Sequence, residues 1–355
     1  MAIDLGFLED LNGLCAADKV DINEAIFQSF NEDASFVEHH QFDTGVKNGR
    51  VIPIVDSAPN YGFLKTSKGS CNMNACEIDS ASSAKKWSPV GYDCRIIVCK
   101  EDLDCDFKEF FKLNCTNKDD LNDAYMRFIV YMVKKNFNAS LWRIGYFDDS
   151  SGDDPDYAGI DGLFIRAAVA APVGSDNRFE IPENAEETVA EQMDLAPDRA
   201  YKLIRDMYNF IATQRSWMLS KVNLHFDITP ELAANYLAYL QDNKEVNCCF
   251  SATDGITGSR YSLDNLNYMG IPIRIRYEWQ GVLQWEMGKE ETPNLNNPHR
   301  ILLTYKGNKP VGVCDTTSFE DFDLWYERKD KQIYVDIATQ LDAKLVLDTD
   351  FALAM

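Results

Sequence analysis

The fold of this chain is decided by the stretch Asn297-Pro298-His299-Arg300-Ile301-Leu302-Leu303-Thr304, which opens its C-terminal segment. Asparagine and proline favour turns, so they end the segment that precedes them. The apolar, partly β-branched run after His299 predicts a short strand over residues 300–305. The stretch therefore marks the point at which the chain changes from mixed structure to strands and turns.

The rest of the C-terminal segment continues as strand and turn. We expect strands at 323–326 and 332–338, which flank the charged turn 327–331 as a hairpin, and a last strand at 345–347. The other features, in order, are Lys306-Gly307-Asn308, Val311-Gly312-Val313, Asp315 and the aromatic pair Trp325-Tyr326.

Two strands near the N-terminus are separated by a long, weakly patterned connection. An Asn48-Gly49 turn signal precedes an apolar strand at 51–55, and a second strand is expected at 94–99. The connection carries four lysines in an otherwise acidic chain: Lys65, Lys68, Lys85 and Lys86. Loops of this length are uncommon inside compact domains and usually have a function or are mobile.

Helices are expected where apolar residues recur every three or four positions. The longest begins near Asn117, after a capping signal, and extends to about residue 140. Two more begin at Pro197 and at Thr229-Pro230-Glu231, where a hydroxyl, a proline and an acid form a start signal. Alternating apolar residues then predict a strand over 271–279.

The chain is strongly acidic, with a formal net charge of −22 and a pI near 4.5. This charge opposes binding to nucleic acid phosphates, which needs clustered lysine and arginine. An ordinary acidic soluble protein and a wall that does not adhere to packed DNA both fit this composition.

Cysteine and apolar patterning point to a reduced, cytoplasmic protein. None of the ten cysteines forms a CxxC pair, and none lies beside a histidine at zinc-ligand spacing. Acids at Asp4, Glu9 and Asp10 interrupt the start, so we expect no signal peptide. No apolar run approaches the ~20 residues that cross a bilayer.

Motifs of catalysis are missing from the sequence. It contains no nucleophile elbow, zinc-protease helix, phosphate-binding loop or dinucleotide fingerprint. His225 lies in an apolar run and is expected to be a packed histidine. The acidic cluster at 148–156 is a candidate calcium loop, but its spacing does not fit the EF-hand, which favours a solvated linker.

Several segments resemble, in order, the tailed-bacteriophage major capsid proteins with the Hong Kong 97-type coat fold. The resemblance is carried by the 297–304 stretch, and by Asn265-Leu266-x-Tyr268-x-Gly270-Ile271-Pro272-Ile273 before it. It implies an α+β subunit with an N-terminal arm, an extended loop, a peripheral domain with a spine helix, and an inserted axial domain. The implied boundaries are arm 1–40, peripheral domain 41–55, extended loop 56–95, peripheral domain 96–158 with a spine helix at about 117–140, axial domain 159–297 and C-terminal peripheral strands 298–355.

The resemblance implies a structural virion protein rather than an enzyme. Many copies would assemble through pentamers and hexamers into an icosahedral shell that encloses double-stranded DNA. Portal, scaffold, head-completion or decoration proteins would be partners, with assembly in the host cytoplasm, and no catalytic residue, cofactor, metal or membrane is implied. The candidate assembly residues are Asn297, Pro298, His299, Arg300, Gly312, Asp315, Trp325, Lys65 and Lys68.

Other interpretations remain open at this point. An encapsulin-type compartment would share the fold and enclose proteins. An acidic metal-dependent enzyme would use the cluster at 148–161, and a soluble binding module would form no shell. Some capsid proteins of this kind link subunits through a loop lysine, and Lys65 and Lys68 lie in the corresponding region, but no partner residue can be assigned.

Overall fold

The computed structural model describes eleven stretches of the chain. They are Phe36 and residues 39–56, 81–99, 121–152, 157–182, 188–243, 266–287, 297–314, 322–327, 329 and 332–355. Within them the chain forms two main sheets, one isolated pair of strands and six α-helices.

The first sheet is organised around one long strand, β12 (Gln332–Ala343). Along one side of it lies β4 (Val90–Cys99), antiparallel over its whole length. The other side pairs with β11 (Phe322–Glu327) at one end and β10 (Pro310–Val313) at the other. A three-residue strand, β1 (Gln41–Asp43), adds to β10 in parallel.

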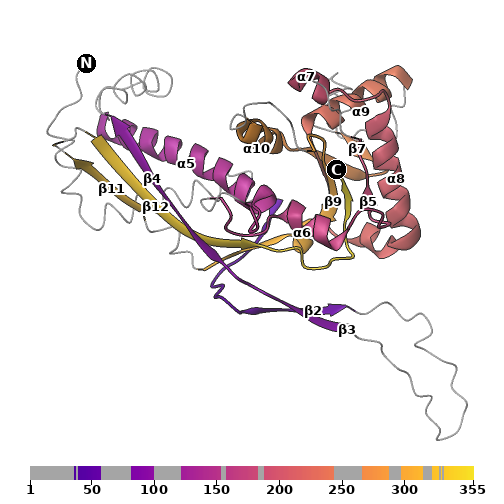
Figure 1. The fold of residues 1–355 in the computed structure, drawn as a ribbon, viewed down its shortest axis with the longest axis horizontal. Coiled ribbons are helices and arrows are strands. Elements are labelled where there is room, and N and C mark those ends of the chain that lie inside the picture. Colours follow the sequence, from indigo (N-terminus) through magenta and orange to yellow (C-terminus); the bar gives the residue numbers. More distant parts are fainter. Residues whose placement is uncertain are drawn as a thin grey trace, which may run out of the picture.

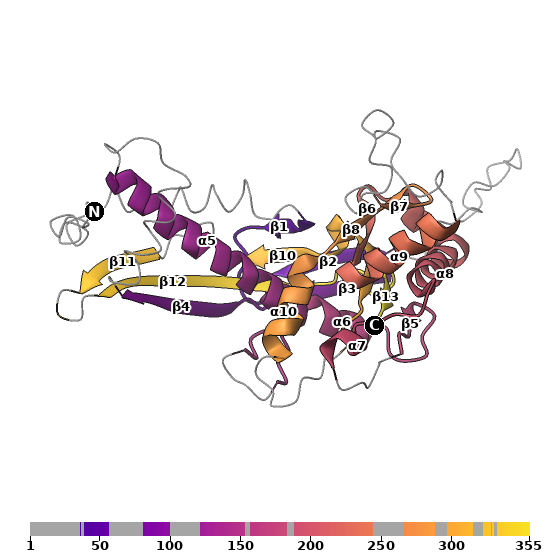
Figure 2. The ribbon, with the colours of Figure 1, turned by 90° about the horizontal axis from the view of Figure 1, so that it is seen from above.

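The longest helix, α5 (Leu121–Phe147), runs beside this first sheet (Figures 1 and 2). Its last turns bury Leu141, Trp142 and Tyr146 in a core shared with β10 and β12. The short helix α6 (Leu163–Ala170) packs against the same core. The predicted spine helix is confirmed in its described part, and it continues seven residues beyond the expected end at 140.

The second sheet has the strand order β5-β13-β9-β6-β8-β7. Its strands are β5 (Arg178–Phe179), β6 (Leu224–Ile228), β7 (Asn267–Tyr268), β8 (Ile271–Ile275), β9 (Ile301–Tyr305) and β13 (Ala352–Ala354). The 297–304 stretch therefore does lead into a strand, and β9 occupies the middle of this sheet.

The second sheet is buried on both faces because its strands alternate between two cores. In β9, Ile301 and Leu303 face one core, whereas Leu302 faces the core that contains α5. Near-continuous apolar runs such as this are typical of strands covered on both sides. The sheet therefore joins the two halves of the molecule.

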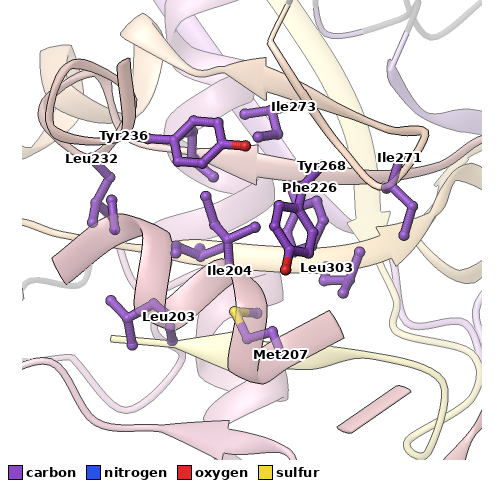
Figure 3. Close-up of a cluster of buried hydrophobic side chains, with 14 of the residues drawn as sticks. Leu203, Ile204, Met207, Phe226, Leu232, Tyr236, Tyr268, Ile271, Ile273 and Leu303 are labelled. Carbon is purple, nitrogen blue, oxygen red and sulfur yellow. The ribbon is translucent and has the colours of Figure 1, made fainter. Parts of the chain in front are cut away.

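Helices α8 (Arg199–Gln214) and α9 (Pro230–Asn243) cover the outer face of the second sheet. Ile204 and Met207 of α8 meet Phe226 and Leu303 of the sheet, with Tyr236 of α9 beside them (Figure 3). The helix α7 (Val189–Gln192) and the 3₁₀ turns at Ser216–Ser220 and Lys306–Asn308 complete this half.

The strand predicted over 271–279 is confirmed only over 271–275, and the strand predicted at 345–347 is wrong. Residues 277–279 begin a helix, α10 (Tyr277–Met287), because the strand ends where Arg276 turns into the interior and Trp279 packs against Tyr146 and Phe164. The expected strand at 345–347 is irregular, because Leu347 donates its amide hydrogen to the Asn308 side chain instead of to a ladder.

Four other predicted strands agree with the structure. The strands at 51–55, 94–99, 323–326 and 332–338 are all present, although β4 and β12 are longer than predicted. Cys94 and Cys314 are free thiols. Within the described part of the chain, no helix combines the length and apolarity that crossing a membrane requires.

Replacing Ile204 by alanine should destabilise the subunit. Ile204 is fully buried between α8 and the sheet, so the lost contacts and the cavity should lower the free energy of unfolding by about 2–5 kcal/mol. Val169→Ala on α6 is the control, because that side chain is 78% exposed and its loss should change stability little. Urea unfolding of the unassembled protein measures both, and equal effects would contradict this packing.

Candidate assembly sites

The isolated strand pair is a hairpin that projects from the body of the subunit (Figure 1). It consists of β2 (Val51–Asp56) and β3 (Ala81–Lys86), which are antiparallel and pair with each other and with none of the other described strands. β2 ends at Asp56, where the predicted extended loop 56–95 begins, and β3 lies within that predicted loop.

Residues 46–50 and 87–88 form the base of the projecting hairpin, which we call its root. Trp87 fixes this root to the first sheet. Its ring is 2% exposed and lies directly on Gly312 of β10, where an added Cβ would come within 2.8 Å of the ring. The backbone of Trp87 exchanges hydrogen bonds with Gly49 and Arg50 (2.8 and 2.9 Å). Val46 in turn donates to the Val313 carbonyl (3.0 Å). A glycine is needed at 312 because the indole occupies the space of a side chain.

A buried carboxylate, Asp342 of β12, also holds this root, directly across the ladder from Gly312. It accepts hydrogen bonds from the amide of Ser88 (2.8 Å) and from Arg166 (3.4 Å), and it pairs with Lys344 at 2.9 Å. Lys85 at the end of β3 adds contacts to the Leu345 carbonyl and to Asp348. Root and sheet therefore form one rigid unit.

Beyond the root, the hairpin strands bury none of the side chains that the structure describes. Val51, Ala84 and Lys86 are exposed, while Ile52 and Lys85 are partly exposed. The described side chains of the hairpin strands are thus left exposed or partly exposed, although its root is fixed to the first sheet.

The motif 297–300 lies at the junction of the two halves, not on the surface. Asn297 has a left-handed backbone (φ 46°), which directs the chain into β9. The Arg300 guanidinium lies against the rings of both Phe147 and Phe164, at 4.7 and 4.6 Å from their centres. Its backbone exchanges hydrogen bonds with Thr229, at the start of α9. Thus the motif fixes α9 and α5 to one strand.

His299 and Pro298 of this motif are buried beside it. Burial lowers the pKa of His299 to about 4, so this histidine is neutral at physiological pH. The motif residues are therefore packing residues in the described structure.

A second junction is a buried ion cluster centred on Asp227 of β6. This carboxylate is completely buried and pairs with Arg276, Lys309 and His225, of which His225 approaches it at 3.1 Å. Burial alone would raise the pKa of Asp227, but the three partners together hold it well below its usual range. Lys309 also donates to the Tyr146 hydroxyl of α5 (3.3 Å).

The ion cluster follows from the alternation of β6 and β8. Phe226 and Ile273 face the outer core, so His225, Asp227 and Arg274 face the side of α5. The prediction of a packed histidine at 225 is confirmed, since it is 0% exposed. Sequence reasoning missed Asp227 and Lys309 as partners, although charged residues inside apolar strands were the available signal.

The remaining candidate residues are less fully described. Trp325 pairs with Tyr334 in the β11–β12 ladder, and only its backbone position is described. Lys65, Lys68 and Asp315 lie outside the described residues. Their part in assembly stays a prediction.

In the described part of the acidic cluster at 148–161, Asp148 and Asp161 contact other side chains of the protein. Asp148 pairs with Arg143 and accepts a hydrogen bond from Tyr92 (2.9 Å), while Asp161 accepts from Ser150. Residues 153–156 are outside the described part of the chain. Among the described residues there is no group of three or more metal-ligating side chains.

Comparison with known proteins identifies the fold. No family model and no curated protein matches the chain. A chain of the satellite phage P4 procapsid, solved with its size determination (Sid) protein, matches at a TM-score of 0.52 with 10% identity, covering 93% of this chain and 98% of that one. The chain therefore has the phage capsid fold, the Hong Kong 97-type α+β fold that the sequence predicted.

Two weaker structural matches accompany it. A chain from Gordonia phage Cozz has a TM-score of 0.49 and 12% identity, covering 90% of this chain and 85% of that one. The SrpI encapsulin of Synechococcus elongatus has a TM-score of 0.44 and 9% identity, with coverages of 91% and 86%.

Gly312→Ala should loosen the hairpin root. The new methyl group would overlap the Trp87 ring, and such overpacking should lower the free energy of unfolding by about 1–3 kcal/mol. Gly307→Ala is the matched control, since its nearest contact would be an ordinary 3.5 Å to Tyr305. Urea unfolding followed by tryptophan fluorescence measures both, and equal stability of the two variants would contradict the contact.

Asp227→Asn should destabilise the junction of the two sheets. Arg276 and Lys309 would remain buried without their counter-charge, which should lower the free energy of unfolding by about 3–5 kcal/mol. Asp336→Asn is the control, because its partner Arg95 is on the surface, where ion pairs contribute little. If both variants melt at the same temperature, the buried cluster does not have this role.

Proposed function

We propose that this chain is a tailed-phage major capsid protein, which assembles through pentamers and hexamers into an icosahedral shell around double-stranded DNA. The fold supports the proposal, but a fold alone does not determine function. The observation that carries it is the projecting hairpin, β2 and β3, with a rigid root and no buried side chain among those described beyond it.

An isolated two-stranded hairpin is at best marginally stable in water. The ladder from Val51–Lys86 to Asp56–Ala81 must therefore gain stability from a surface outside the described subunit. Val51 is 48% exposed, and a β-branched side chain of this kind is suited to burial against a neighbour. A second copy of the same chain is the partner that a shell supplies.

A contact between this hairpin and a different surface of the next copy is heterologous. Such contacts close into rings when the rotation between copies allows it, and rings of five and six copies build an icosahedral shell. The hairpin and its root carry exposed Lys47, Arg50 and Lys86, whereas the chain as a whole has a net charge of −22. The basic root would meet a neighbour that is acidic on average, which favours correct register.

The net charge also supports the proposed contents. A subunit of this charge would repel phosphate on average, so DNA would be enclosed without being bound through its backbone or read by sequence. An encapsulin-type shell would differ in enclosing protein instead.

The proposal also assigns roles to the predicted axial domain and to the remaining candidate assembly residues. Residues 159–297 would form the axial domain around which the rings close, and Lys65, Lys68, Asp315 and Trp325 would lie at or near subunit contacts. The protein would reside in the virion capsid, with portal, scaffold, head-completion or decoration proteins as partners.

Electron microscopy of the expressed protein, with light scattering on the same sample, tests the proposal. We expect closed shells or rings of five and six, because the hairpin supplies a heterologous contact on every copy. A 260/280 nm absorbance ratio on isolated shells then distinguishes nucleic acid from protein contents. A 40.3 kDa monomer at every concentration, also with a crowding agent, would contradict self-assembly.

Val51→Asp should block assembly without unfolding the subunit. The exposed position tolerates a charge in the free subunit, but the same charge would be buried without a partner at the proposed contact. Val51→Thr is the matched control, since it keeps the β-branched shape without a charge. Light scattering should show assembly for threonine and its loss for aspartate, and normal assembly of the aspartate variant would exclude this hairpin surface as the contact.

A further inference from the structure

Phe36, His39 and His40 lie beside the ion cluster, just before β1 begins. His40 is 1% exposed and contacts the rings of Phe36, Trp142 and Tyr146, with ring centres 4.4, 6.2 and 5.5 Å away. Its Nδ1 lies 2.9 Å from the carbonyl oxygen of Lys309. A carbonyl accepts, so Nδ1 carries the hydrogen and donates it.

This hydrogen bond leaves Nε2 of His40 as the site of further protonation. That nitrogen is buried and has no hydrogen-bond partner in the described structure. A proton added there would place a charged N–H in the interior without an acceptor, which is costly. The geometry therefore accommodates His40 in its neutral form.

His39 is also accommodated in its neutral form, for a different reason. Its Nδ1 lies 3.3 Å from a guanidinium nitrogen of Arg274, which can only donate, so Nδ1 must accept. Protonation would place two positive groups at this distance.

Several charged or titratable groups face the two histidines from the surrounding elements. They are His225 and Asp227 of β6, Arg274 of β8, Arg276 after it, Lys309 before β10 and Tyr146 of α5. Burial lowers the pKa of His39 to about 3 and that of His40 well below its usual value. Arg276 and Lys309 contribute to the lowering of both pKa values, and Asp227 opposes it.

We propose that Phe36, His39 and His40, together with β1, form an acid-sensitive latch that docks with both histidines neutral and is released when they take up protons. β1 is suited to release, since it is a three-residue strand held in parallel at the edge of β10. The latch connects the preceding chain to the body at the ion cluster. This inference concerns the single subunit and goes beyond the proposed function, because it holds whether or not the chain forms a shell.

The direction of the pH dependence follows from linkage. Once released, the histidines have pKa values of about 6.5. The docked histidines have lower pKa values, so the docked state binds fewer protons. Docking is therefore strongest above about pH 6.5 and weakens as the pH falls. Each histidine that stays neutral when docked reduces the docking equilibrium by about tenfold per pH unit, so two reduce it by about a hundredfold.

Hydrogen exchange of the full-length protein, read by mass spectrometry, tests the latch. Protection of the amides in Gln41–Asp43 is measured from about pH 8 to about pH 5, corrected for intrinsic exchange, with β6 (Leu224–Ile228) as internal reference. We expect protection of β1 to fall by up to about a hundredfold per pH unit below about pH 6.5, while β6 stays protected. A protection of β1 that does not change with pH overturns the proposal.

Two variants separate the latch from general acid unfolding. His39→Gln keeps an acceptor for Arg274 without a titrating group, so the fall should become about tenfold per pH unit. His299→Gln removes another buried histidine, far from β1 in the sequence, and should leave the wild-type slope unchanged. A His39→Gln slope equal to wild type, or loss of the slope in His299→Gln, overturns the proposal. If either variant does not fold, the wild-type slope of β1 against β6 still decides it.

Discussion

The arrangement of this subunit depends on one buried charge, the carboxylate of Asp227. It lies on β6 in the second sheet, and its partner Lys309 immediately precedes β10 in the first sheet. Arg276, the third member, lies where β8 gives way to α10. A buried carboxylate must be paired, so both sheets and α10 are restrained to positions that bring their cations to it. The apolar cores would tolerate sliding of one half over the other far better than this cluster does, because dispersion contacts are not directional.

The packed body fixes the direction of the hairpin that projects from it. The direction in which β2 and β3 project is fixed by two contacts. The Trp87 ring packs on Gly312, and the Ser88 amide donates a hydrogen bond to Asp342. In the proposed assembly, an arm with a defined direction would select one position on a neighbour, whereas a freely hinged arm would reach many. The body and the root would thus predetermine the geometry of the proposed contact.

Local pattern predicted much of the fold, and long-range pairing could not be predicted. The helix that ends at Phe147 and the strands β4 and β12 were predicted from the spacing of apolar residues, although the helix and β12 continue beyond their predicted ends and β4 begins before its predicted start. The boundary at Tyr277 was missed because alternation continues through Trp279, and only the distant Asp227 explains why Arg276 turns inward. The pairing of β1 with β10 joins residues 269 apart and leaves no local signal. The same holds for Trp87 and Gly312, whose contact carries the candidate site.

The motif 297–300 shows why recognising a fold and locating its contacts are separate problems. The Arg300 guanidinium lies against Phe147 and Phe164, and the Arg300 backbone amide donates to the Thr229 hydroxyl. Each of these contacts is internal, so the motif explains how α5, α9 and β9 pack together. It does not indicate where a neighbouring copy would bind. Side chains buried in this way are constrained by packing within the protein, whereas the exposed Val51 is not. The residues that identify the fold therefore lie inside it, and the contacts of the proposed assembly are to be sought at exposed positions that carry no recognisable motif.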